Sequence, residues 1–145
     1  MDDLTQSEAD RLFNLEKRKV LDEEIGWPLG AKVAVQLVSL DGREEFILDV
    51  STYSIKVSKI TLQNRVRTTA ILARLDIDGP THRNPDDAVI LCPHVHLFRE
   101  GFNDKWAFPV PSVQFQDLSN RVKTLEDFMR YCNITDPPSF SFGLF

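Results

Sequence analysis

The sequence is poor in cysteine, in glycine and in long apolar runs. Only Cys92 and Cys132 carry thiols among 145 residues, and they lie too far apart for a CxxC pair and are too few for a disulfide framework or a cysteine-based zinc site. No segment approaches the roughly 18 apolar residues that a membrane-spanning helix needs. The six glycines form no phosphate-binding loop, and GxSxG and HExxH motifs are also lacking. These absences exclude most nucleotide-binding proteins and the zincin metalloproteases.

The first ten residues, MDDLTQSEAD, are acidic and contain no apolar stretch. They predict neither a secretory signal nor a basic transit peptide. Because the scarcity of cysteine suits a reducing compartment, we expect a cytoplasmic protein that does not associate with membranes.

The composition is typical of one folded domain. Hydrophobic residues make up 42% of the chain and charged residues 27%, and the formal net charge is −5. A chain of this length can bury a core of its own. We therefore expect a single domain over residues 1–145.

Hydrophobic periodicity predicts a helix, then a sheet, then a second helix. A Thr5–Glu8 capping pattern predicts a helix over about 6–19, and Thr124–Asp127 resembles a second capping box before a helix over about 125–132. Alternating apolar residues over about 31–110 predict strands, among them 66–77 and 88–98. The tail 139–145 is apolar, so we expect it to dock on the body or on a partner. The predicted class is α+β, a curved antiparallel sheet of five to seven strands with N-terminal and C-terminal helices packed on it.

All three histidines fall between positions 82 and 96. Because side chains alternate along a strand, His94 and His96 should project from one face. If strands 66–77 and 88–98 pair across the 78–87 loop, Arg74 and Asp76 become neighbours of that histidine pair.

Three interpretations of this cluster are open. The three histidines could bind zinc with an Asp or a water as the fourth ligand. Alternatively, without a metal, His94 and His96 could act as base and acid on a phosphodiester, with His82 assisting from the loop. In the third interpretation His94 and His96 are ordinary strand residues and His82 is a loop residue. Arginines that could hold the phosphate in the second interpretation are Arg74, Arg83 and Arg99.

A basic stretch runs from Ser51 to Leu75 and contains no Asp or Glu. It could follow a phosphate backbone or bind an acidic protein. It could also be the solvated face of a sheet, or pair within the molecule with residues 1–24, which carry eight acidic and four basic side chains. The basic residues are Lys56, Lys59, Arg65, Arg67 and Arg74.

Several segments of the sequence form one recognisable pattern: the run from Leu75 to Pro85, Pro93–Gly101 and Asp104–Ala107, with Gln63–Arg65 and Phe128–Ile134. On these segments the sequence resembles an uncharacterised family of small bacterial and phage proteins. The resemblance implies a toxin–antitoxin or defence-type gene neighbourhood and a small helix-turn-helix antitoxin as partner. It assigns no role to any residue.

We therefore hypothesise a toxin-like RNA hydrolase, with no cofactor or, in the alternative, zinc. The different-class alternative is a non-catalytic interaction module, such as a phage inhibitor or an antitoxin partner. Its partner would be RNA or an acidic protein, and a homodimer is compatible with the sequence. The candidate catalytic residues are His94, His96 and His82, and the candidate substrate contacts are Arg74, Arg83, Arg99, Lys56, Lys59, Arg65 and Arg67.

Overall fold

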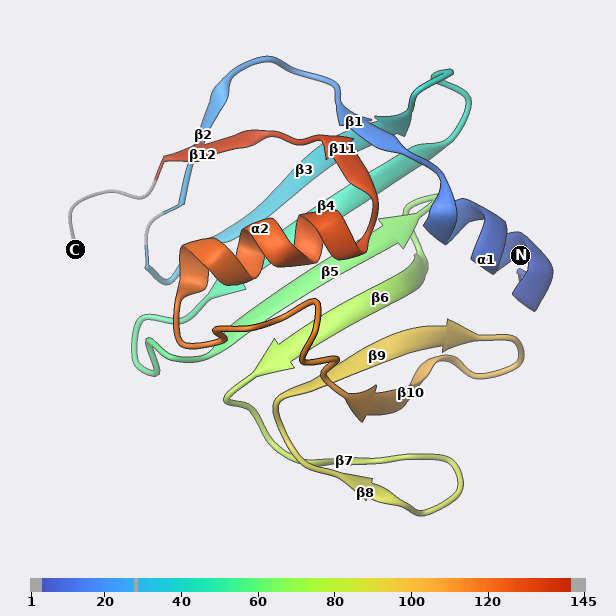
Figure 1. The fold of residues 1–145 in the computed structure, drawn as a ribbon, viewed down its shortest axis with the longest axis vertical. Helices are drawn as coiled ribbons and strands as arrows, with labels where there is room; N and C mark the ends of the chain where they lie inside the picture. The colour runs from blue at the N-terminus through green and yellow to red at the C-terminus, as the bar shows by residue number, and fades with distance from the viewer. Residues whose placement is uncertain (1–3, 28, 142–145) are drawn as a thin grey trace.

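The core of the fold is an open eight-stranded sheet, seen in a computed structural model that describes residues 4–27 and 29–141 (Figure 1). The strand order is β10-β9-β6-β5-β4-β3-β1-β11, and every pair is antiparallel except β1 with β11. The α+β prediction is confirmed, and the sheet has eight strands because β1 and β11 extend one edge. The strands are β1 Lys17–Lys19, β3 Lys32–Ser39, β4 Glu45–Thr52, β5 Ile60–Val66, β6 Ala70–Ile77, β9 His94–Arg99, β10 Asn103–Pro109 and β11 Ile134–Asp136.

Helix α2, Arg121–Tyr131, lies across one face of the sheet in front of β4 and β5 (Figure 1). The predicted second helix is confirmed, and its apolar side chains Leu125, Phe128 and Met129 are all buried in the core. The predicted cap is wrong by one turn. Asn120 caps the helix by accepting from the backbone N–H of Lys123, while the Thr124 hydroxyl is buried and donates to the Asn120 carbonyl at 2.7 Å.

Helix α1, Gln6–Asn14, is shorter than the predicted 6–19. Its N-cap is as predicted, because the Thr5 hydroxyl oxygen accepts from the Glu8 N–H at 3.1 Å. The chain leaves the helix after Leu15 because the buried Lys17 side chain turns back and donates to the carbonyls of Phe13 and Leu15. Residues 17–19 then form β1 instead of a last helical turn.

Strands β6 and β9 pair across the intervening loop, as the sequence predicts. The predicted strand 66–77 begins only at Ala70, because Arg67 and Thr68 adopt positive φ angles of 53° and 65° in a turn. The predicted strand 88–98 divides at Pro93, which has no N–H for a ladder. Its first part, β8 (Val89–Ile90), pairs instead with β7 (His82–Arg83).

The tail docks on the body over the part that the structure describes. Strand β12, Ser139–Ser141, pairs in parallel with β2, Glu24–Gly26. The Phe140 ring packs on Trp27 with centroids 6.2 Å apart. Residues 142–145 lie outside the described chain. In the described ranges, neither helix is long and apolar enough to cross a membrane.

Candidate functional site

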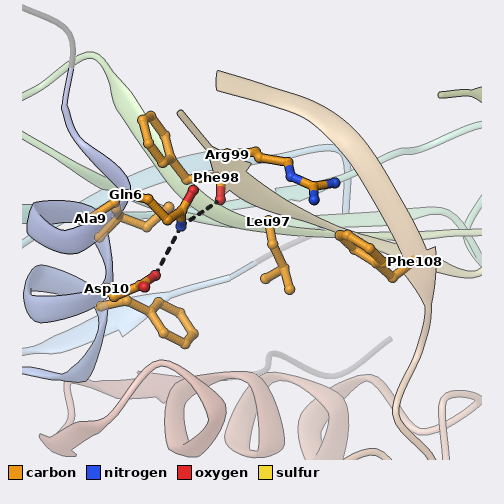
Figure 2. A pocket seen from close by; sticks show the side chains of 9 residues that line it. Gln6, Ala9, Asp10, Leu97, Phe98, Arg99 and Phe108 are labelled. Carbon is orange, nitrogen blue, oxygen red and sulfur yellow. Dashed lines mark hydrogen bonds between the residues drawn. The ribbon is translucent and has the colours of Figure 1, made fainter. Parts of the chain in front are cut away.

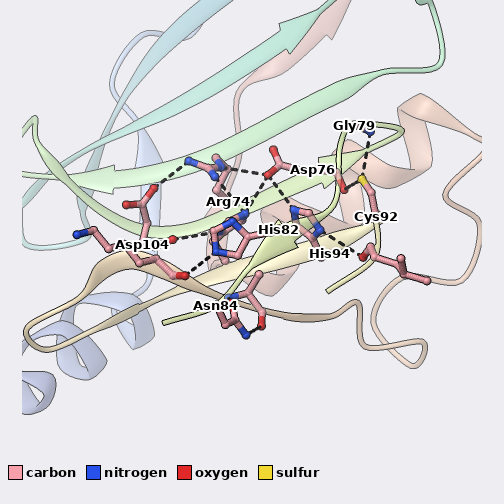
Figure 3. A network of polar contacts seen from close by, with 12 residues as sticks. Arg74, Asp76, Gly79, His82, Asn84, Cys92, His94 and Asp104 are labelled. Atoms are coloured by element: carbon pink, nitrogen blue, oxygen red, sulfur yellow. Dashed lines mark hydrogen bonds and ion pairs between the residues drawn. The ribbon is translucent and has the colours of Figure 1, made fainter. Parts of the chain in front are cut away.

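Asp76, His94 and His96 converge on one face of the sheet (Figure 3). The cross-strand register sets Asp76 opposite His94, and His96 follows two positions along β9. The Asp76 Oδ2 atom lies 3.3 Å from His94 Nε2 and 3.1 Å from His96 Nε2. Both imidazoles are buried. Two adjacent strands thus bring one carboxylate and two ring nitrogens to one point.

The second nitrogen of each ring faces a backbone carbonyl. His94 Nδ1 lies 3.2 Å from the Leu91 oxygen, and His96 Nδ1 lies 2.8 Å from the Asp104 oxygen. A carbonyl oxygen can only accept, so Nδ1 carries the hydrogen in both rings. In its neutral form each ring therefore presents the lone pair of Nε2 to Asp76.

Arg74 lies beside this trio, directly opposite His96 in the register. Its Nε atom donates to Asp76 Oδ2 at 3.2 Å, and its Nη2 atom lies 3.0 Å from His96 Nε2. Its Nη1 atom donates to Asp104 Oδ2 at 2.8 Å. The guanidinium is therefore fixed by two carboxylates and one imidazole.

His82 reaches the same place from strand β7. Its ring centroid lies 4.6 Å from that of His96 and 6.0 Å from that of His94. His82 Nε2 lies 2.7 Å from the Lys105 carbonyl oxygen. The nearby Asn84 is buried and exchanges two hydrogen bonds with the backbone of Ala107, of 2.9 and 2.8 Å. Strand β7 is thereby attached to β10, which places all three histidines together.

A small pocket of about 180 Å³ opens beside the histidines. Its walls include His82, His94 and His96 together with Lys59 and Tyr53. The Lys59 ammonium lies 4.6 Å from the centre of the Tyr53 ring, and no carboxylate in the described ranges pairs with it. The pocket therefore combines acceptor atoms with an unpaired cation on its wall.

The surroundings of the site lower the pKa values of both Asp76 and His94. Burial alone would raise the pKa of Asp76, but the adjacent His96 ring and the charge of Arg74 act in the other direction and leave this pKa below its ordinary value. Burial lowers the pKa of His94, and the adjacent His96 adds to the shift. Both shifts favour an ionised carboxylate beside a neutral imidazole.

Most of the predicted basic contacts are paired within the molecule. Lys56 Nζ lies 3.2 Å from an Asp78 carboxylate oxygen, and Arg65 Nε lies 2.7 Å from Asp49. Arg67 contacts Glu8 at 3.2 Å and Glu44 at 3.3 Å. Of the basic stretch, only Lys59 and Arg74 line the pocket.

Arg83 and Arg99 do not line this pocket. Arg83 donates to the Asp87 carbonyl within the β7–β8 hairpin. The Arg99 guanidinium stacks 4.7 Å from the Trp106 ring centre, and Arg99 lines a separate pocket between α1 and the β9–β10 hairpin (Figure 2). Strand alternation explains why Arg99 lies away from the histidines. Side chains at odd positions of β9, including Arg99, point to one face, and those of His94 and His96 point to the other.

Sequence reasoning placed Asp76 and Arg74 near the histidines but missed what orients the group. Asp104 contributes both the carboxylate that fixes Arg74 and the carbonyl that faces His96. A register shift in β10 between Asn103 and Trp106 accompanies this arrangement. Residues 101–104 have the composition of a turn, but a turn motif gives no direction for a carbonyl oxygen.

Comparison with protein families gives one match. The model of a family described as "Family of unknown function (DUF6978)" matches residues 4–134. No curated protein and no solved structure matches the chain.

Proposed function

Because the chain belongs to DUF6978, a family of unknown function, we propose its activity from the pocket itself: hydrolysis of a phosphodiester bond in single-stranded RNA. The observation that carries the proposal is the convergence of Asp76, His94 and His96 beside a small pocket. Carboxylates and imidazoles that meet in a cleft are typical of sites that activate water.

The three converging atoms suit the attacking water. Asp76 Oδ2 and His94 Nε2 are acceptors, so a water that donates one O–H group to each has its oxygen positioned and its O–H bonds polarised. That oxygen adds to phosphorus, the bond from phosphorus to the leaving ribose oxygen breaks, and one proton of the water ends on the leaving oxygen. His82, at the pocket wall, lies where it can contact the substrate.

The size and charge of the pocket support a single phosphate as guest. Lys59 has no carboxylate partner among the described residues and can approach a phosphate oxygen, and Arg74 supplies a second positive charge behind the histidines. A cavity of about 180 Å³ admits one phosphate group but not a duplex. A flexible single strand can present such a group, which favours RNA loops or ends over paired regions.

The cellular setting is part of the same proposal. The resemblance to small bacterial and phage proteins of toxin–antitoxin neighbourhoods supports a toxin-like cytoplasmic hydrolase that a small helix-turn-helix protein holds inactive. An antitoxin of this kind would cover the pocket mouth near Lys59 and His82.

Cleavage of a labelled single-stranded RNA by the full chain tests the proposal. We expect Asp76→Asn and His94→Ala to lower the cleavage rate by about 10²–10⁴-fold, because the first removes the negative charge of the water site and the second removes one acceptor. Lys59→Ala should lower it by about tenfold through loss of one phosphate contact. Lys123→Ala is the matched control, since Lys123 pairs with Asp127 on α2 and lies far from the pocket.

Equal cleavage by the wild type and by folded Asp76→Asn protein would refute catalysis at this site. Melting curves and circular dichroism of each variant separate loss of activity from loss of fold. Asp76→Asn keeps the side-chain shape, so it remains informative if His94→Ala fails to fold.

A second candidate function is a non-catalytic interaction module. The supporting observation is the loop between β4 and β5, where Ile55 is 99% exposed and Val57 is 52% exposed. Apolar side chains exposed together are typical of contact surfaces. In a growth-arrest assay this candidate predicts that Ile55→Asp abolishes the effect while Asp76→Asn retains it, and the hydrolase predicts the reverse.

A further inference from the structure

We propose that Asp76, His94 and His96 bind one first-row divalent metal ion, with Zn²⁺ as the best-matched ion. The ligand atoms are Asp76 Oδ2, His94 Nε2 and His96 Nε2, which all lie within 4.8 Å of one another. With the ion bound, these three atoms would hold the metal, and the attacking water of the proposed function would lie in the adjoining pocket. The site stands on its own geometry and does not require that RNA be the substrate.

The orientation of the two imidazoles is the first argument. Each Nδ1 atom faces a backbone carbonyl, at 3.2 Å for His94 and 2.8 Å for His96. A metal-binding histidine almost always donates its other ring N–H to a carbonyl or carboxylate, which fixes the tautomer and aims the lone pair. Two such rings on one strand, aimed at the same carboxylate, have the form of a prepared ligand set.

The arrangement of acceptors is the second argument. The lone pairs of two Nε2 atoms and the charge of a carboxylate face each other at 3.1 and 3.3 Å. Acceptors repel unless a positive centre lies among them. Arg74 meets this need for Asp76 and His96, and the partner of His94 Nε2 is Asp76 Oδ2 at 3.3 Å. Either a proton or a metal ion between these two atoms would satisfy both, and the metal titration below distinguishes the two cases.

The distances fit a small ion. Ligands at about 2.1 Å from a tetrahedral ion lie about 3.4 Å apart, and those at right angles about 3.0 Å apart. The separations of Asp76 Oδ2 from His96 Nε2 and His94 Nε2, 3.1 and 3.3 Å, fall between these values, and all three atoms lie within 4.8 Å of one another. Both carboxylate–imidazole pairs therefore match the spacing that a small ion requires.

The donor set selects the class of metal. Two imidazoles and one carboxylate suit Zn²⁺, Fe²⁺ and similar ions, whereas Ca²⁺ and Mg²⁺ prefer oxygen ligands. Cys92 is not a ligand, because its sulfur accepts from the Gly79 N–H and donates to the Asp76 carbonyl, both at 3.2 Å. The sequence-based zinc interpretation used three histidines, whereas the structure groups two histidines with Asp76 and attaches His82 to the Lys105 carbonyl.

Charge and space also accommodate the ion. Asp76 and Asp104 carry two negative charges against the one positive charge of Arg74, so these three side chains have a formal net charge of −1. Asp104 can retain Arg74 through the 2.8 Å pair when an ion takes over Asp76. The adjoining pocket leaves room for water or a substrate atom at the remaining coordination positions.

The test is a metal titration of the full chain, expressed without a histidine tag and stripped with a chelator. We expect Zn²⁺ to bind at one equivalent per chain in competition with a chromophoric chelator, and to raise the melting temperature. Co²⁺ should give visible ligand-field bands from nitrogen and oxygen coordination. Asp76→Asn and His94→Ala should each weaken Zn²⁺ binding by at least about 100-fold and abolish the thermal shift.

His82→Ala is the matched control, an imidazole on the same pocket wall that we expect to change zinc affinity by less than about threefold. Absence of a one-to-one complex, or equal binding by Asp76→Asn and wild type, would overturn the site. A large loss in His82→Ala would overturn the ligand set. His94→Gln replaces His94→Ala if the latter does not fold. Zinc binding without RNA cleavage would leave this site intact and refute only the proposed hydrolysis.

Discussion

Among single residues, Lys17 has the most unusual environment. Its ammonium is fully buried and donates to the carbonyls of Phe13, Leu15 and Cys132 at 2.7–2.8 Å. No carboxylate among the described residues accompanies it. Burial lowers the pKa of Lys17 to about 8, and burial raises the pKa of the neighbouring Cys132 thiol to about 12. The single ammonium of Lys17 thus donates hydrogen bonds to carbonyls at the C-terminal ends of both helices.

The lowered pKa of Lys17 predicts a rise in stability at mildly alkaline pH. In the unfolded chain this lysine stays protonated up to about pH 10.5, whereas in the folded chain it releases its proton near pH 8. Between these two pH values the unfolded state therefore binds more protons than the folded state. A rise in pH then favours the folded state. We expect the free energy of unfolding, measured with urea, to increase by about 1 kcal/mol from pH 7.5 to 9.

Lys17→Met provides the comparison. The variant should be less stable by about 2–4 kcal/mol, because three carbonyls lose their donor, and its stability should no longer rise over this pH range. Above pH 9 the wild-type curve should flatten and then fall, since the unfolded chain ionises Cys132 and the folded chain does not. A wild-type curve that is flat from pH 7.5 to 9 would contradict the assigned pKa of Lys17.

The sequence predicted which side chains come together, but it did not predict how they are oriented and buried. The spacing of His94 and His96 was enough to place both rings on one face, and the Asp76 neighbour followed from strand pairing. The spacing could not show that both rings are buried, because a strand pattern records only its own alternation. The two rings are covered by β7, which is remote from them in the sequence, and by the backbone carbonyl of Asp104. A side-chain pattern predicts neither contact.

At the level of elements, Asn84 connects the β7–β8 hairpin to the sheet. Its side-chain amide pairs with both backbone polar groups of Ala107, in a buried position. This pairing substitutes for a strand partner at the β10 edge. His82 lies two residues away on the same hairpin.

We predict that Asn84→Ala detaches this hairpin. The substitution leaves a buried N–H and a buried carbonyl without partners, so it should lower the free energy of unfolding by about 1–3 kcal/mol. Hydrogen exchange at Ala107 should accelerate at the same time. Asn14→Ala, an exposed asparagine at the end of α1, is the control and should stay within about 0.5 kcal/mol of wild type. Slow exchange at Ala107 in Asn84→Ala would show that the hairpin does not depend on this pair.

Elements with a strong period of their own were predictable, and short ones were not. The α2 stripe and strands β3, β4 and β6 follow from local alternation. Strands β1, β2, β11 and β12 have only three residues each, so they carry no measurable period. They exist because Lys17 pairs with Ile134 and Glu24 with Ser139 across most of the chain.

For the whole molecule, internal pairing decides how the basic stretch behaves. Lys56, Arg65 and Arg67 face Asp78, Asp49 and Glu8 or Glu44. Exposed pairs of this kind add little stability. They do reduce the positive potential that a nucleic acid would meet, in a chain whose net charge is already −5.

We therefore predict a weak salt dependence of RNA binding. With Lys59 and Arg74 as the contacts, the logarithm of the association constant should fall against the logarithm of salt with a slope of about −1.4, whereas five free cations would give about −3.5. Fluorescence anisotropy of a labelled single strand with Asp76→Asn protein measures the slope without cleavage. A slope near −3.5 would show that the basic side chains leave their acidic partners for RNA.

The fold class followed from the order of the elements, because helix, alternating strands and helix leave few ways to bury apolar faces. The pairing of β1 with β11 at one edge of the sheet could not be predicted in this way. It depends on residues 117 positions apart, such as Lys19 and Asp136, and sequence spacing carries no signal at that range.

The alignment of β6 with β9 has one more consequence. Leu75 and Val95 face each other in the core, and on the reverse side Asp76 faces His94. A slip of either strand by one position would send its apolar side chain into the pocket and its polar side chain into the core. The burial energy that holds Leu75 against Val95 is thus the same energy that keeps carboxylate and imidazole face to face, and neither can drift while the other stays.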